Sequence, residues 1–194
     1  MSRIVACEFL SLDGVAQAPG GVDEDRDGGF QHGGWHMAYM DEIAQEWVKK
    51  GFARAGGFLL GRRTYEIFAS YWPGAPDEEA EVAGPLNELP KYVVSSTLTE
   101  PLAWQNSTVL GSDPSAAEAL RDLDGTDIMI FGSTKLVRSL LELGLVDDLW
   151  LMIDPVVLGG GKRIFSDSGE LRGWRLLDSQ VTGTGAILAR YDRA

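Results

Sequence analysis

The sequence predicts an α/β domain whose central sheet is mostly parallel and carries an antiparallel edge. Short runs of strand-forming residues alternate with helical patterns along most of the chain, and a short glycine-containing turn joins the last two strand-like runs. Alternating strands and helices build parallel units, whereas a tight turn joins antiparallel neighbours. No repeat, linker or low-complexity segment divides the 194 residues, so we expect one domain over residues 1–194.

The first third of the chain is expected to contain a strand, a long loop, a helix and a second strand. Residues 4–10 are rich in strand formers and end in the turn-like SLDG. Residues 17–34 are dense in Gly and Asp, and a loop of this length inside a domain is usually functional or disordered. Apolar residues three and four apart predict a helix over 37–52, and GGFLLG at 56–61 is typical of a buried strand.

The middle of the chain continues the alternation. Residues 64–69 have a helical pattern that the following YWPGAPDE interrupts. The acidic residues within 77–88 favour either an exposed helix or a charged loop. KYVVSST at 91–97 and STVLG at 107–111 each predict a strand.

The last part of the chain supplies two further helices and the closing hairpin. DPSAAEALRDLDG predicts a helix that Asp113 caps and Pro114 begins. The apolar residues of STKLVRSLLELGL recur at helical spacing, which predicts a second helix. The other expected elements are a strand in 126–133, a strand in 146–161 that runs into a glycine-rich loop, and a hairpin of 174–182 and 186–191.

Composition limits the partners and the compartment that we expect. The net charge of -12 argues against nucleic acid or an anionic membrane as the main partner, because both require a basic surface. Cys7 is the single cysteine, lies in a predicted buried strand and forms no internal disulfide, which favours a reducing compartment. The N-terminal sequence lacks the pattern of a signal peptide, and no apolar run approaches the roughly 18 residues of a membrane span. We therefore expect a cytoplasmic protein.

Three predicted strands end in small, hydroxyl-bearing or basic residues, which points to an anion site. In an open α/β sheet the ligand lies beyond the carboxyl ends of the strands, where helix N-termini present free N–H groups. Each end taken alone is more typical of a helix cap or a solvated arginine, but the three together favour a ligand with more than one phosphate. The three ends are Gly61, Arg62, Arg63 and Thr64; Ser95 and Ser96; and Gly132, Ser133, Thr134 and Lys135.

Several sharper motifs are not met. LGGGKRIF lacks the first glycine and the terminal Ser or Thr of a P-loop, and no G-x-G-x-x-G opens a helix after the first strand. His32 and His36 are four residues apart, but two glycines between them disrupt a helical metal-binding face, and a third ligand is not evident. The sequence therefore predicts no metal site.

The motifs SLDG, GRRTYE and VVSST, the segment 130–165 and the closing hairpin resemble the dihydrofolate reductase-like superfamily. The resemblance extends over nearly the whole chain. It is strongest with the C-terminal reductase domain of the riboflavin-biosynthesis deaminase–reductase. This resemblance implies a three-layer fold, a mostly parallel eight-stranded sheet with flanking helices, and NADPH bound across the strand ends.

The resemblance also implies a role for each candidate residue. Arg62 and Arg63 would flank the adenosine 2'-phosphate, and Thr64 would lie at the pyrophosphate. Ser95 and Ser96 would lie beside the adenosine ribose and its phosphate. Asp13 and Gly14 would border the nicotinamide. The residues expected to hold the pyrophosphate or to close the site are Gly61, Gly132, Ser133, Thr134, Lys135, Leu136, Gly159, Gly160 and Gly161.

Two carboxylates are candidates for the catalytic proton donor. Asp41 follows Trp35 at nearly the spacing seen in dihydrofolate reductases, and Asp13 directly follows the first strand. Each has a structural alternative, because Asp41 is also favourable in a first helical turn beside Glu42, and Asp13 is also a turn former.

We expect an NADPH-dependent reductase of a small heterocyclic or carbonyl-bearing substrate, either pterin-like or ribosylamino-pyrimidine-like. The alternatives are a nucleotide-binding protein of the same fold without turnover, and a protein whose long loop serves assembly. The zinc motif of the riboflavin enzymes' deaminase domain is not present in these residues. Trp150, Leu151 and Met152 lie on a strand that is apolar on both faces, which suits either a dimer or a monomer that buries them under helices. The resemblance implies a homodimer, because the riboflavin members of the family pair through their sheets.

Overall fold

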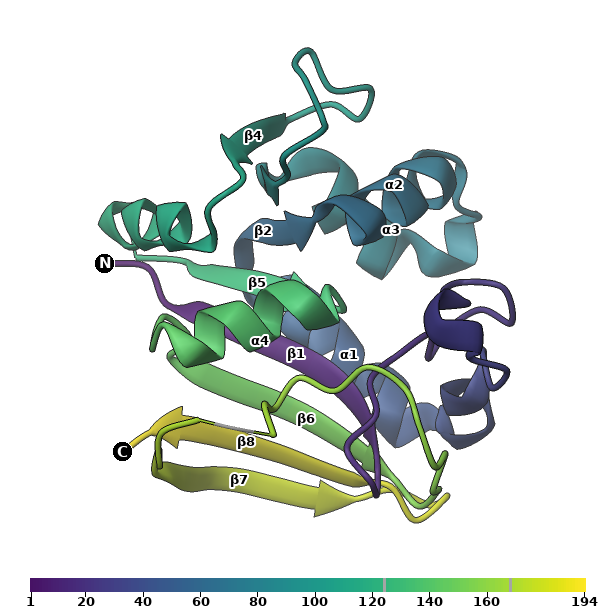
Figure 1. Cartoon of the computed structure of the whole chain (residues 1–194). Helices are drawn as coiled ribbons and strands as arrows, with labels where there is room; N and C mark the ends of the chain where they lie inside the picture. The colour runs from purple at the N-terminus through teal and green to yellow at the C-terminus, as the bar shows by residue number, and fades with distance from the viewer. Residues whose placement is uncertain (124, 168) are drawn as a thin grey trace.

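A twisted eight-stranded sheet runs through the residues that the computed structural model describes, which are 1–123, 125–167 and 169–194 (Figure 1). The strand order is β4-β3-β2-β5-β1-β6-β8-β7. All pairings from β4 to β6 are parallel, and β8 pairs antiparallel with both β6 and β7. The strands are β1 (Ile4–Ser11), β2 (Ala55–Gly61), β3 (Lys91–Val94), β4 (Ser107–Gly111), β5 (Asp127–Phe131), β6 (Asp148–Asp154), β7 (Trp174–Val181) and β8 (Ile187–Arg193).

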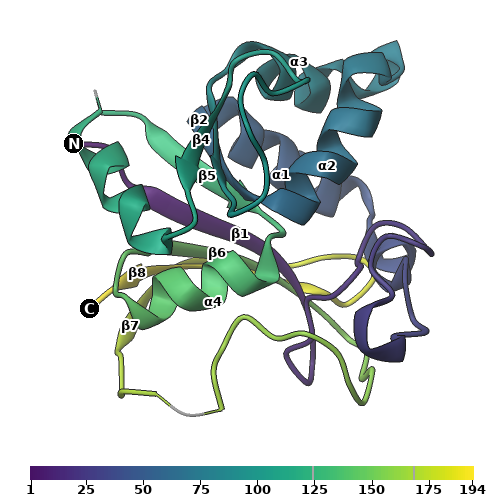
Figure 2. The same ribbon diagram turned by 45° about the horizontal axis from the view of Figure 1, so that its top comes forward.

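Helices cover both faces of the sheet (Figure 2). The α-helices α1, α2 and α3 lie on one face, and α4 lies on the other (Figure 2). Coverage of both faces explains why β1 and β5 are nearly continuous apolar runs. The helices are α1 (Glu42–Arg54), α2 (Arg62–Tyr71), α3 (Ala80–Glu88) and α4 (Thr134–Glu142), with 3-10 turns η1 (Asp27–Gly29), η2 (Trp35–Tyr39), η3 (Trp72–Gly74), η4 (Asp77–Glu79) and η5 (Pro114–Asp122).

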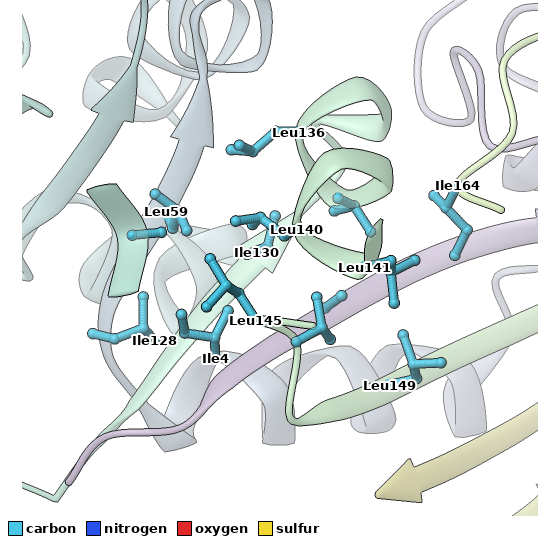
Figure 3. Packing of buried hydrophobic residues seen from close by; sticks show 14 of the residues in the cluster. Ile4, Leu59, Ile128, Ile130, Leu136, Leu140, Leu141, Leu145, Leu149 and Ile164 are labelled. Atoms are coloured by element: carbon cyan, nitrogen blue, oxygen red, sulfur yellow. The ribbon is translucent and has the colours of Figure 1, made fainter. Parts of the chain in front are cut away.

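The core under α4 is built from aliphatic side chains of the central strands and of the helix. Leu136, Leu140 and Leu141 of α4 belong to one buried cluster with Ile4 of β1 and Ile130 of β5, and Leu140 lies beside Ile130 (Figure 3). Burying each such side chain contributes roughly 1.5–3 kcal/mol. This packing fixes α4 on the sheet and, with it, the position of the helix N-terminus.

The core on the opposite face contains more aromatic residues. Phe52 of α1 stacks on Phe131 of β5 with ring centroids 4.1 Å apart, and Trp150 of β6 lies in the same cluster. Cys7 is buried there, as predicted, and burial raises the pKa of its thiol well above the ordinary value. Among the described residues, no helix has both the length and the apolar character that crossing a membrane requires.

The predicted helix over 37–52 is wrong in its first five residues. The segment Trp35–Tyr39 forms the 3-10 turn η2, and α1 begins only at Glu42. Apolar residues at a spacing of three suit a 3-10 turn as well as an α-helix, so the pattern did not mark the boundary. The helix predicted after Asp113 is likewise a 3-10 helix, although Asp113 caps it as expected by accepting a hydrogen bond from the Ser115 N–H.

Candidate functional site

The ends of β2 and β5 meet because these strands are parallel neighbours. The N–H of Gly61 donates to Oγ of Ser133 at 2.9 Å, and the N–H of Ser133 donates to Oγ1 of Thr64 at 3.0 Å. Two motifs that lie about seventy residues apart in the sequence are therefore linked by reciprocal hydrogen bonds. This link holds the N-termini of α2 and α4 beside one another.

The backbone before α4 turns through the left-handed region at two successive residues. Gly132 has φ 63° and Ser133 has φ 58°. Glycine adopts this conformation without steric cost, whereas serine does so at a cost that the surrounding contacts must offset. The first N–H groups of α4 have no partner within the helix, so this turn presents them to whatever lies beyond the strand ends.

A cavity of about 360 Å³ lies over these helix N-termini. Its walls also include Gln17 and Ala18 from the loop after β1, and Lys162 from the glycine-rich loop after β6. The structure thus brings together predicted residues from two of the three strand ends. Those that line the cavity are Gly61, Arg62, Arg63, Thr64, Gly132, Ser133, Thr134, Lys135 and Leu136.

At the third strand end, Val94 of β3 lines this cavity, but the two predicted serines after it do not. Oγ of Ser95 accepts hydrogen bonds from the N–H groups of Thr97 and Leu98, so it closes the turn after β3. Within the described part of the chain, Ser95 and Ser96 line neither this cavity nor the adjoining one.

A second cavity, of about 720 Å³, adjoins the first. The two share Gln17, Asp27, Lys135 and Lys162 as wall residues. A ligand over the N-terminus of α4 can therefore extend from one cavity into the other. The other walls of the second cavity are Gly28, Gly29, Phe30, Gln31, His32, Leu158, Gly160 and Gly161.

Asp13 fastens the glycine-rich loop to the end of β1. Its carboxylate accepts hydrogen bonds from the Leu158 N–H at 3.0 Å, the Gly159 N–H at 2.9 Å and the Ser11 hydroxyl at 2.7 Å. Partial burial alone would raise the pKa of Asp13, but these hydrogen bonds lower it below its ordinary value. The carboxylate and Gly159 thus support the wall of the second cavity, although neither residue is among those that line it.

Asp41 is the N-cap of α1. Its carboxylate accepts from the Ala44 N–H at 3.0 Å and from the Thr184 N–H at 3.2 Å, in the turn between β7 and β8. The hydrogen bond from Ala44 makes the largest contribution to lowering the pKa of Asp41. In the described residues, Asp41 lines neither of the two cavities above α4, so the structure places it at a junction of α1 and the hairpin.

The structure reveals an ion cluster that the sequence analysis did not anticipate. Asp25 and Asp27, in the loop after β1, each contact both Arg63 and Lys162. Hydrogen bonds from Arg63 and Lys162 hold the pKa of Asp27 well below its ordinary value. We call Asp25 and Asp27 the acidic pair. Its members come from the Gly- and Asp-rich segment, whose composition indicated a loop but not what the loop contacts.

A buried His–Asp pair was also not anticipated. His36 Nδ1 lies 2.7 Å from Oδ2 of Asp154 at the end of β6, and the His36 ring stacks on Phe9 with centroids 3.8 Å apart. Burial raises the pKa of Asp154, and the hydrogen bond to His36 reduces that effect. The histidine spacing considered for a metal site thus places His36 in the core, where it anchors the end of the loop to the sheet.

Comparison with known proteins identifies relatives over most of the chain. The family model described as the RibD C-terminal domain matches residues 3–188. A Bacillus subtilis (strain 168) protein, the uncharacterized protein YyaP, is 31% identical over 137 residues, which are 69% of this chain and 71% of that protein.

Solved structures share the fold at low sequence identity. A Shewanella sp. PV-4 protein described as a riboflavin biosynthesis protein has a TM-score of 0.68 at 19% identity, covering 100% of this chain and 99% of its own. A pyrimidine reductase-like protein from Corynebacterium diphtheriae has a TM-score of 0.68 at 15% identity, and the match covers 100% of this chain and 92% of that protein. Dihydrofolate reductase from Enterococcus faecalis, solved with NADP(H) and RAB-propyl, has a TM-score of 0.62 at 14% identity. This match covers 98% of this chain and 96% of that protein. The predicted dihydrofolate reductase-like fold is therefore confirmed.

Proposed function

The chain belongs to the RibD C-terminal domain family, and from this membership we propose that it is an NADPH-dependent reductase of a small molecule. The observation that carries the proposal is the cavity over the N-termini of α2 and α4, which gathers Arg62, Arg63 and Lys135 in a chain of net charge -12. Basic side chains that lie at helix N-termini, beside small residues, suit a ligand with several phosphates.

The residues of the cavity fit the cofactor that the fold family uses. The first-turn N–H groups of α4 and the hydroxyl of Thr64 suit a pyrophosphate, and the guanidinium of Arg62 or Arg63 suits a 2'-phosphate through a bidentate contact. Bound NADPH supplies a hydride to the substrate. The second cavity adjoins the N-terminus of α4, and we assign it to a heterocyclic or carbonyl-bearing substrate, pterin-like or ribosylamino-pyrimidine-like.

We propose Asp13, whose carboxylate supports the wall of the second cavity, as the group that controls the proton, with Asp41, which lines neither cavity, as the alternative. The pKa values of both carboxyl groups are lowered by hydrogen bonds, so each is ionised at neutral pH. An ionised carboxylate stores no proton, and its role is to orient and polarise a water that donates one. The alternative function, a nucleotide-binding protein without turnover, requires the first cavity but neither carboxylate.

Two measurements on the purified protein test the proposed function. A reductase oxidises NADPH in the presence of a member of a panel of pterins, ribosylamino-pyrimidines and small carbonyl compounds, which absorbance follows directly. A protein without turnover is stabilised by NADPH in a thermal shift assay and oxidises none with any substrate. Absence of both NADPH binding and oxidation contradicts the proposal and its alternative together.

The cofactor preference gives a sharper prediction for the same site. We expect NADPH to bind about tenfold or more tightly than NADH, because a charged hydrogen bond to the 2'-phosphate is lost with NADH. The double variant Arg62→Ala, Arg63→Ala should abolish this preference in calorimetric titrations at fixed ionic strength. Arg138→Ala is the matched control, because Arg138 pairs with Glu142 on the exposed side of α4. An unchanged preference in the double variant would contradict the assignment of these arginines.

We also propose that the protein is a homodimer, but for a reason that differs from the sequence-based one. Trp150, Leu151 and Met152 are buried within one copy, so they are not available for a partner. The hairpin of β7 and β8 instead leaves Leu176, Val181 and other apolar side chains exposed. An exposed apolar hairpin at the edge of a sheet is a typical surface for association.

A further inference from the structure

The loop between β1 and α1 places two carboxylates where the proposed function requires phosphates. Nη2 of Arg63 donates to Oδ1 of Asp27 at 2.9 Å, and Nζ of Lys162 donates to Oδ2 of Asp27 at 2.8 Å. Asp25 contacts the same two cations through its two carboxylate oxygens. All four side chains border the first cavity. The acidic pair therefore holds both Arg63 and Lys162 within that cavity.

The acidic pair is positioned by a buried side chain rather than by a chance surface contact. Gln17 is 2% exposed, and its Nε2 donates to the carbonyl oxygens of Asp25 and Asp27 at 3.0 Å each. Oε1 of the same amide accepts from the backbone N–H of Lys162 at 3.0 Å. One buried amide thus fixes the backbone of both acids and of one cation that they contact.

A phosphate must compete with two carboxylates for these cations while the acidic pair is in place. Arg63 donates to carboxylates through both of its terminal nitrogens, and Lys162 donates to one oxygen of each acid. Two carboxylates also compensate the charge of two cations, so this part of the cavity attracts an anion weakly. Lys135 and the first turn of α4 lie outside the cluster and are available for a different phosphate of the same ligand.

We infer that the acidic pair is a built-in competitor for phosphate, which sets the affinity and the phosphate selectivity of the cavity. This inference rests on the proposed function for the identity of the ligand. A ligand phosphate that takes over the terminal nitrogens of Arg63 displaces Asp25 and Asp27, and this displacement moves the segment around η1 away from α2. Ligands that place phosphate only at α4 bind without this displacement. The acidic pair therefore acts on the phosphate nearest Arg63, which the proposal identifies as the 2'-phosphate.

The test compares phosphate ligands across charge-neutralised variants of the loop. The variant Asp25→Asn, Asp27→Asn keeps the size of both side chains and leaves the Gln17 contacts intact, because those contacts go to the backbone. We expect it to bind NADPH and adenosine 2',5'-bisphosphate at least about fivefold more tightly than the original protein does, in calorimetric titration. Inorganic pyrophosphate, which needs only the α4 end, should change by less than about twofold.

Asp23→Asn is the matched control, because Asp23 lies in the same loop and pairs with Arg26 instead. It removes one negative charge from the loop without touching Arg63 or Lys162, and we expect less than about a twofold change with every ligand. If Asp23→Asn increased the ligand affinity as much as the double variant does, net charge and not displacement would determine the affinity. That result would overturn the inference.

Hydrogen exchange provides a second readout on the unaltered protein. Adenosine 2',5'-bisphosphate should accelerate exchange of the amides in residues 24–30, because the acidic pair leaves Arg63. Slower exchange there, or equal affinities in the double variant and the original protein, would overturn the inference and leave the proposed function standing. Tighter bisphosphate binding by the double variant, with no NADPH binding or oxidation by any protein, would support the inference and contradict the proposed function. No binding of any phosphate ligand contradicts both.

Discussion

Buried ionisable side chains occur on both faces of the central strands. Glu8 of β1 is 2% exposed, and its Oε1 has no hydrogen-bond partner among the described residues. Burial raises its pKa well above the ordinary value. His36 and Asp154 lie near the end of β1 and share one hydrogen bond. Of these groups, Glu8 offers the simplest experimental case, because burial is the cause of its shift.

Glu8→Gln should stabilise the protein at neutral pH and have little effect in acid. Below about pH 4.5 the carboxyl is protonated in the folded and the unfolded chain, so a neutral amide of the same size changes little. At higher pH the unfolded chain ionises while the folded chain holds the proton. The folded state of the original protein therefore loses about 1.4 kcal/mol per pH unit relative to the variant, until the raised folded pKa is passed.

Urea unfolding at several pH values measures this difference. Glu46→Gln, at an exposed position on α1, is the control and should show no such growth with pH. A constant difference between Glu8→Gln and the original protein from pH 4 to pH 8 would mean that Glu8 is ionised in the fold.

At the scale of elements, α1 depends on one residue for its start and for its contact with the hairpin. Asp41 accepts from Ala44 in the first turn of the helix and from Thr184 in the turn between β7 and β8. Oγ1 of Thr184 in turn donates to the carbonyl oxygen of Tyr39. The N-terminus of α1 and the hairpin turn are thus joined by contacts on both sides of the cap.

Asparagine and alanine at position 41 separate the capping role from the catalytic one. Asparagine caps helices about as well as aspartate, whereas alanine does not. We expect Asp41→Asn to lower the thermal midpoint less than Asp41→Ala does, because the amide keeps one of the two acceptor oxygens that contact Ala44 and Thr184. If Asp41 controls the proton, Asp41→Asn should also reduce turnover while leaving NADPH affinity nearly unchanged. Full activity of Asp41→Asn from pH 5 to pH 8 would rule out Asp41 and leave Asp13 as the candidate. Glu42→Gln, which should do little, is the neighbouring control.

At the scale of the whole molecule, the sheet has a well-covered centre and an open edge at β7. β1, β5 and β6 lie between helical layers, but β7 is exposed along nearly its whole length. Val181 is 64% exposed and Leu176 is 51% exposed, and both belong to this outer strand. The edge that carries β7 is therefore the surface from which a second copy would be expected to approach.

Light scattering tests the proposed dimer. One chain has a mass of 21.1 kDa, so a dimer at micromolar concentration should scatter as a particle of about twice that mass. Val181→Lys together with Leu176→Lys should shift the population to single chains without unfolding them, because both side chains are exposed. Lysine at the exposed Val22, far along the chain from the hairpin, is the control. A mass of one chain for the original protein would contradict the dimer.

The sheet was predictable because strand periodicity and turn residues are local signals. The runs around β1, β2 and β5 are largely apolar. β2 ends at Gly61, Gly132 directly follows β5, and the turn-like SLDG begins at the last residue of β1. The start of α1 was not predictable, since a 3-10 turn and an α-helix share the spacing that was used. The local patterns predicted strand-like runs at all eight strand positions, whereas the dihydrofolate reductase-like fold and the cofactor came from the family resemblance.

The candidate site was predictable only in part, because some of its contacts join residues that lie far apart in the sequence. Gly61 to Thr64 and Gly132 to Leu136 carry local signals of helix N-termini, and parallel strand pairing brings them together. The contact between Lys162 and Asp25 joins residues 137 positions apart, and it depends on how a long loop folds back. No local pattern encodes such a pairing, so the sequence indicated a loop but not its partners.

The neutralised cations at the cavity also bear on how fast a ligand arrives. While Asp25 and Asp27 compensate Arg63 and Lys162, an anion in solution meets the field of the whole chain, whose net charge is -12. That field repels a phosphorylated dinucleotide during its diffusive approach. Dissolved ions screen the repulsion over a Debye length of about 8 Å at physiological ionic strength. The bimolecular rate constant should therefore rise as salt is added, the reverse of the behaviour of clefts whose exposed basic residues draw anions in.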